Sequence, residues 1–132
     1  MKITASVLAG ITDHSRGEAP LECCGLLAGR DGLIDEYVRT RNVKASRVAY
    51  QIDPKEHLAA IKSLRVRGQS ILGAYHSHPR TPAVPSATDV AEAYYGEGFL
   101  YVIVSLDGQV PDIRAYELRG GSLVVTELAA VP

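Results

Sequence analysis

One stretch organises the chain: Ile71-Leu-Gly-Ala-Tyr-His76-Ser-His78-Pro79-Arg-Thr-Pro-Ala-Val-Pro-Ser86-Ala-Thr-Asp89. Its apolar first half predicts a buried strand, in which residues two apart project from the same face, so His76 and His78 point together. Pro79 ends the strand because proline has no N–H to donate to a ladder. After a proline-rich loop, Ser86 is a candidate helix cap and Asp89 falls on the first turn of that helix.

These residue types are suited to holding a catalytic metal. Two imidazoles on one strand face and a carboxylate returned by a short loop give three ligands of a zinc site whose fourth position stays open for water. A structural interpretation competes, because Ser86-x-x-Asp89 also fits an ordinary capping box. The rigid loop beside the histidine pair favours the metal site, since packing alone does not explain polar residues at the end of an apolar strand.

The motif reads His-Ser-His, seven residues, Ser86, two residues, Asp89, with an upstream glutamate in Pro20-Leu-Glu22-Cys-Cys-Gly-Leu-Leu27. In these residues the chain resembles the JAMM (MPN+) metalloprotease family, and the resemblance extends from about Ile3 to Leu128. The resemblance implies a cytidine-deaminase-like α/β fold. It also implies a Zn²⁺ ion at the end of the sheet, held by His76, His78 and Asp89.

The resemblance also implies the roles of two further residues. Coordination lowers the pKa of a zinc-bound water from about 15.7 toward about 7, and Glu22 is the general acid/base that accepts its proton and later protonates the leaving amine. The residue pattern alone does not choose Glu22 over Glu18 or Glu36. Ser86 donates to the oxyanion of the tetrahedral intermediate. A serine nucleophile is less favoured, because the sequence has no Gly-x-Ser-x-Gly elbow.

Family members cleave peptide or isopeptide bonds at the C-terminus of ubiquitin or ubiquitin-like proteins. The segment between Asp89 and Phe99 has no room for the insertion with which the larger deubiquitinases grip ubiquitin. The chain therefore resembles the compact prokaryotic members, among them the sulfur-carrier-protein–cysteine hydrolases. We expect its partner to be a ubiquitin-like or sulfur-carrier protein whose extended C-terminal tail adds as a strand beside the metal.

Two other functions stay open at this point. The chain could be a non-catalytic MPN scaffold or partner-binding module, although scaffold members typically lack some of the motif positions that are present here. It could also be a small-molecule zinc amidohydrolase on a related fold. A deaminase is disfavoured, because the sequence has no Pro-Cys-x-x-Cys ligand pair.

Length and charge limit the number of domains and the kinds of partner that the chain could have. The 132 residues are enough for one domain, spanning 1–132, and the net charge of −1 comes without a basic stripe, so a nucleic-acid partner is not expected. No apolar run approaches the roughly 20 residues of a membrane span, and no signal peptide is evident, which favours a cytoplasmic protein. Cys23 and Cys24 are expected to be reduced and buried, because neighbours on a strand face opposite sides. A homodimer is also possible, and only the family resemblance suggests it.

The hydrophobic pattern predicts one mixed sheet flanked by about three helices. In chain order it predicts a helix over 5–17, strands over 23–28, 33–40 and 48–52, a helix after 53–54, a strand over 70–76, a helix over 87–95, a strand over 99–106, and a hairpin of 113–118 with 123–128.

Several single residues have expected places. Thr4 and Asp53 are candidate N-caps. The second helix is expected to end at Gly68 and to turn Leu58, Ile61 and Leu64 toward the core. His14 and His57 are expected on the surface, and Ser77 is expected to be structural, because it points away from the two histidines.

Overall fold

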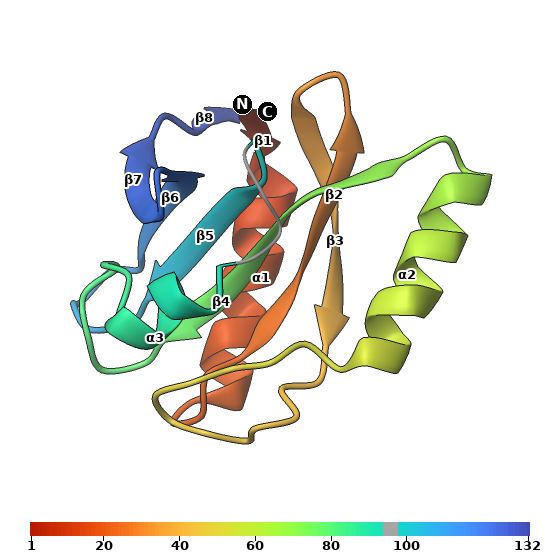
Figure 1. Cartoon of the computed structure of the whole chain (residues 1–132). Coiled ribbons are helices and arrows are strands. Elements are labelled where there is room, and N and C mark those ends of the chain that lie inside the picture. The colour runs from red at the N-terminus through yellow and green to blue at the C-terminus, as the bar shows by residue number, and fades with distance from the viewer. Residues whose placement is uncertain (94–97) are drawn as a thin grey trace.

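The computed structural model describes residues 1–93 and 98–132 and has an eight-stranded sheet as its centre (Figure 1). The strand order is β7-β6-β5-β4-β2-β3-β1-β8. The elements are β1 (Lys2–Thr4), α1 (Ala5–Glu18), β2 (Cys24–Arg30), β3 (Leu33–Thr40), α2 (Pro54–Val66), β4 (Ser70–His78), α3 (Ala87–Ala91), β5 (Leu100–Ser105), β6 (Asp112–Arg119), β7 (Ser122–Thr126) and β8 (Ala129–Val131).

The strand β4 lies in the middle of the sheet. It pairs antiparallel with β2, where Cys24 is opposite His76, and parallel with β5, where His78 is opposite Ser105. In Figure 1 the end of β4 lies beside the short helix α3. The proline-rich loop therefore has to bridge only from one end of the central strand to the helix next to it.

The two long helices cover opposite faces of the sheet. Along β2, Leu27 packs with Val7 and Ile11 of α1, whereas Leu26 packs with Leu64 of α2. Because both faces are covered, β2 is apolar at nearly every position rather than at alternate ones, as in a fully buried strand. The mixed α/β architecture that the sequence predicts is confirmed.

The predicted helix boundaries agree closely with the structure. The hydroxyl of Thr4 accepts a hydrogen bond from the Val7 N–H, and the carboxylate of Asp53 accepts from the Lys55 N–H at 2.8 Å. Helix α2 ends just before Gly68, whose φ of 73° lies in the left-handed region that favours glycine. The third helix is shorter than predicted, since α3 ends at Ala91; its predicted end near Tyr95 lies outside the described residues.

The prediction of a strand over 48–52 was wrong. Only one isolated bridge, between Asn42 and Ile52, is present, and the segment between them is a loop. The side chain of Asn42 replaces the strand ladder: its carbonyl oxygen accepts from the N–H groups of Lys44 and Gln51, and its amide donates to the Ala49 carbonyl. Apolar residues in a short segment predict burial, but here the side chain of Asn42, several positions away, determines the conformation of the backbone.

The prediction that Leu58 of α2 faces the core was also wrong. Leu58 is 54% exposed, whereas Ala60 and Leu64 are buried. At 100° per residue, Leu58 lies about 120° around the helix from Leu64, so it faces away from the sheet.

The other strands match their predictions within a few residues, except that the short strands β1 and β8 were not predicted. Each is three residues long, and they pair in parallel with each other. Such short segments carry too little periodicity to be recognised. Cys23 and Cys24 are both free and buried, as expected. No helix within the described part of the chain is both long and apolar enough to cross a membrane.

Candidate metal centre

Three side chains converge at the end of β4. The Nε2 atoms of His76 and His78 are 3.1 Å apart, and they lie 3.2 Å and 3.0 Å from Oδ2 of Asp89. All three residues are buried. Ligands at about 2.0–2.1 Å from a tetrahedral Zn²⁺ are separated by about 3.3 Å, so the three atoms already have nearly the spacing that such an ion requires. This group could hold a metal ion.

Backbone contacts orient two of the three side chains. Nδ1 of His78 donates to the Pro82 carbonyl at 2.8 Å, which fixes the proton on Nδ1 and leaves the lone pair of Nε2 facing the cluster. Oδ2 of Asp89 accepts from the Ser86 N–H at 2.9 Å, while the Ser86 hydroxyl accepts from the Asp89 N–H. The capping box that the sequence predicts is therefore present, and it holds the Asp89 carboxylate beside the two imidazoles.

Two of the three residues have pKa shifts that favour the protonation states of ligands, whereas for His78 burial, which would lower the pKa, is outweighed by the Asp89 carboxylate, which raises it. Burial by itself would raise the pKa of Asp89, but its contacts with the two imidazoles outweigh burial and hold that pKa well below its usual range. Burial lowers the pKa of His76, so its imidazole stays neutral. A charged carboxylate and a neutral imidazole are the forms that bind a divalent cation.

Glu22 stands beside the cluster with a buried carboxylate. The residue is only 4% exposed, and its Oε1 has no hydrogen-bond partner within the described residues. Burial raises its pKa to about 7; the charge of His78 opposes this rise and the charge of Asp89 adds to it. A buried oxygen without a partner is an unsatisfied hydrogen-bond acceptor, which a water, an ion or a donor of a substrate can satisfy.

A cavity of about 320 Å³, here called the site pocket, joins these groups. It is lined by Pro20, Glu22, Arg47, Val48, His78, Pro79, Arg80, Thr81 and Ser86. The chain thus brings the five predicted site residues into one region: three form the cluster, and Glu22 and Ser86 line the pocket beside it.

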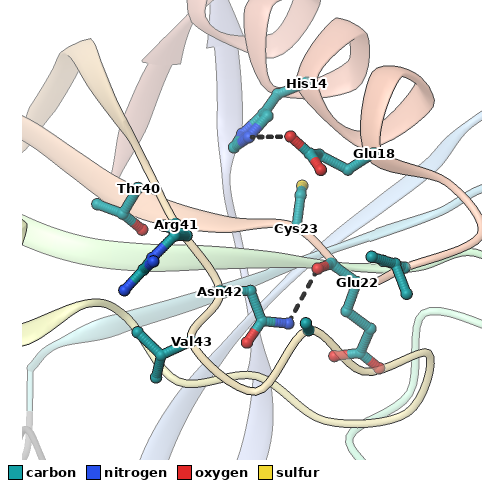
Figure 2. A pocket seen from close by; sticks show the side chains of 10 residues that line it. His14, Glu18, Glu22, Cys23, Thr40, Arg41, Asn42 and Val43 are labelled. Carbon is teal, nitrogen blue, oxygen red and sulfur yellow. Dashed lines mark hydrogen bonds and ion pairs between the residues drawn. The ribbon is translucent and has the colours of Figure 1, made fainter.

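The loop over residues 41–52 holds this region in place, which the sequence did not reveal. The Glu22 N–H donates to the Ser46 carbonyl at 2.8 Å, and the Glu22 carbonyl accepts from the Asn42 amide at 3.0 Å. Figure 2 shows this second bond, with the Glu22 carboxylate extending away from the Cys23 thiol. The ring of Tyr50 stacks on His76, with centroids 4.2 Å apart and planes at 19°. The contacts of Asn42 with Glu22 and of Tyr50 with His76 join residues far apart in the chain, so no local motif marks them.

Ser77 links the two strands that carry the site. Its hydroxyl accepts from the Cys23 N–H at 2.8 Å, and its own N–H donates to the Cys23 carbonyl at 3.1 Å. The prediction of a structural role for Ser77 is confirmed.

The prediction that His14 lies on the surface was wrong. His14 is 5% exposed, and its Nδ1 is hydrogen-bonded to the Tyr75 hydroxyl at 2.7 Å. It lines a second cavity, of about 300 Å³, together with Glu18 and Cys23 (Figure 2). Its partner lies 61 residues along the chain, so no local pattern indicates this contact. His57, also expected on the surface, is partly buried.

Comparison with known proteins identifies the family. Residues 4–119 match the family described as prokaryotic homologs of the JAB domain. The chain belongs to this family. The resemblance seen in the motif is confirmed, and with it the expected fold.

Named relatives of this JAB-domain chain are peptidases. A desampylase of Haloferax volcanii is 38% identical over 123 residues, which cover 87% of this chain and 82% of the relative. A probable TtuB-protein conjugate cleaving protease of Thermus thermophilus is 41% identical over 112 residues, covering 84% and 71%. The CysO-cysteine peptidase of Mycobacterium tuberculosis is 28% identical over 123 residues, covering 92% and 84%.

Solved structures show the same fold. A protein of Desulfitobacterium hafniense superposes with a TM-score of 0.90 at 32% identity, covering 98% of this chain and 92% of that one. A JAB1/MPN domain protein of Archaeoglobus fulgidus gives a TM-score of 0.66 at 23% identity, covering 99% and 97%. The predicted MPN fold class is therefore confirmed.

Proposed function

We propose that this chain is a zinc-dependent metallopeptidase that hydrolyses an amide bond at the C-terminal tail of a ubiquitin-like or sulfur-carrier protein. The observation that carries the proposal is that Glu22, whose carboxylate oxygen Oε1 is buried and has no partner within the described residues, lines the same pocket as His78 of the cluster of His76, His78 and Asp89. Relatives named as a desampylase, a conjugate-cleaving protease and a carrier–cysteine peptidase support the substrate class.

The residues of the cluster suit zinc among the divalent metals. Two imidazole nitrogens and one carboxylate oxygen are common ligands of a catalytic zinc ion that keeps an open position. When bound, zinc supplies Lewis-acid chemistry, making a water acidic near neutral pH and polarising a carbonyl. The three cluster residues are also buried, so few other ligands could reach a bound ion and compete with them.

The protein groups account for the proton transfers. Burial raises the pKa of Glu22 to about 7, so near neutral pH its carboxylate can accept a proton from water and then donate it to the leaving amine. Ser86 keeps its hydroxyl proton free for donation, because in the capping box that hydroxyl serves as an acceptor. It could therefore hydrogen-bond the developing oxyanion without giving up its structural contact.

The test combines metal content with cleavage. We expect one zinc per chain in the wild type and in Glu22→Gln, and none in His78→Ala, whereas His57→Ala, which changes a histidine outside the cluster, should keep its zinc. Cleavage of a peptide whose tail ends in Gly-Gly joined to a further residue should be lost in Glu22→Gln and in His78→Ala. Zinc bound in the wild type with no cleavage would favour the scaffold alternative. Cleavage of small amides but not of peptides would favour the amidohydrolase.

A further inference from the structure

The site pocket carries two positive charges that the proposed chemistry does not use. Arg47 comes from the loop that follows β3, and Arg80 comes from the loop that follows β4, yet both line the same cavity as Glu22 and His78. Within the described residues, neither arginine forms a salt bridge or a side-chain hydrogen bond, and both are exposed. Their guanidinium groups are therefore available to a ligand.

The charge of the pocket favours an anionic group close to the reacting atoms. Glu22 is the single carboxylate among the residues that line the pocket, against two guanidinium groups. A guanidinium presents several N–H donors in a planar fork that matches a carboxylate. Two such forks from opposite loops could hold both oxygens of one carboxylate, with the apolar side chains of Val48 and Pro79 beside them.

The position of Glu22 indicates which part of the substrate occupies this pocket. Glu22 has to donate a proton to the leaving amine, so the leaving group lies against the wall that Glu22 forms. The glycine tail of a carrier protein has no charge of its own near the scissile bond. A carboxylate this close to the leaving amine is the α-carboxylate of a free C-terminal amino acid. A lysine joined by an isopeptide bond has its carbonyl within the chain and offers no such charge.

We infer that Arg47 and Arg80 bind the α-carboxylate of the leaving residue, and that the preferred substrate is a carrier tail extended by one amino acid through an ordinary peptide bond. This inference rests on the proposed function and narrows its substrate class. In the reaction, the amide R–CO–NH–CHR′–COO⁻ and one water give R–COO⁻ and ⁺H₃N–CHR′–COO⁻. The C–N bond breaks, a C–O bond forms, and both protons of the water end on the amine, so no other reactant is needed.

Three peptides with the same sequence up to Gly-Gly test this inference. The first ends in Gly-Gly-Ala with a free carboxylate, the second ends in Gly-Gly-Ala amide, and the third joins Gly-Gly to the ε-amine of an acetylated lysine amide. Charge-assisted hydrogen bonds are strong enough to change affinity by roughly tenfold to a hundredfold. We expect the zinc-loaded protein to cut the free acid at least about tenfold faster in kcat/KM than either neutral peptide, mainly through KM.

Charge-removing variants assign the preference to the two arginines. The double variant Arg47→Gln/Arg80→Gln should cut the free acid only as fast as the amide, with unchanged zinc content. A double change to lysine should keep part of the preference, because the charge stays but the fork is lost. Arg65→Gln, which removes an exposed arginine of α2 outside the site pocket, should behave as the wild type.

Two results would overturn the inference and leave the proposed function standing. One is equal cleavage of the acid and the amide by the wild type, and the other is a preference for the acid that survives in the double glutamine variant. Faster cleavage of the isopeptide than of the free acid would likewise reject it and point to a conjugated lysine as the leaving group. If none of the three peptides is cut while one zinc is bound per chain, the proposed peptidase function itself fails.

Discussion

Replacing Asn42 by alanine removes the side chain that organises the loop over residues 41–52. That side chain makes four hydrogen bonds to backbone groups, two as donor and two as acceptor, at 3.0 to 3.1 Å. One of the donated bonds holds the carbonyl of Glu22, and the other holds the carbonyl of Ala49. The substitution therefore acts on the stability of the loop and on the position of the proposed general base.

The size of the effect follows from the exposure of these bonds. The two accepted bonds are exposed, so water can replace the side-chain oxygen at small cost. The two donated bonds are partly buried, and each contributes about 1 kcal/mol. We expect Asn42→Ala to lower the free energy of unfolding by about 2 kcal/mol, which for a chain of this size lowers Tm by roughly 6 to 10 °C.

Urea and thermal denaturation of the metal-free protein measure this loss directly. Gln51→Ala is the matched control, because Gln51 is exposed on the same loop and its side chain makes no hydrogen bond within the described residues. The control should unfold as the wild type does. Cleavage by the zinc-loaded Asn42 variant should fall mainly in kcat, since Glu22 is held less firmly. A loss of stability below about 0.5 kcal/mol, or a similar loss in the control, would refute the assignment of this role to Asn42.

Three further outcomes are expected. Burial raises the folded-state pKa of Glu22 from 4.5 to about 7, so the metal-free wild type should lose more stability than Glu22→Gln as pH rises from about 5 to about 7. Denaturation of both proteins at the two pH values checks this, and equal losses would contradict it. Burial raises the pKa of Cys24 to about 12 and also raises that of Cys23, so Ellman's reagent at pH 8 should detect both thiols only after unfolding. Gly25→Ala should lower stability by about 1–3 kcal/mol in thermal denaturation, because the added methyl would collide with the ring of Tyr75; an unchanged Tm would show that the ring can move away.

The convergence of His76, His78 and Asp89 could be predicted from the sequence because its signals are local. His76 and His78 are neighbours on one strand face by the geometry of any strand, and Ser86 and Asp89 are joined by a helix cap. Each pair needs only its own segment to be folded correctly. The loop between them is short, so bringing the pairs together required little further information.

The contacts that support the site could not be predicted from the sequence, because their signals are not local. His14 is buried, and its Nδ1 is hydrogen-bonded to the hydroxyl of Tyr75, on a strand 61 positions later. The segment before Ile52 looked like a strand, but its backbone is held by the amide of Asn42 instead of by a neighbouring strand. The pattern of apolar residues reports burial, and it does not report which distant polar group satisfies a given backbone atom.

The pair of hydrogen bonds between Ser77 and Cys23 has a consequence for how the site opens. These bonds join β4, which carries the histidines, to the residue that follows Glu22. Neither β4 nor the segment that carries Glu22 can therefore open without the other. Their two amide protons should therefore exchange with solvent deuterium only when the whole sheet unfolds, at the slowest rate in the protein. On heating, catalytic competence should then disappear in the same transition as the sheet, with no earlier loosening of the site.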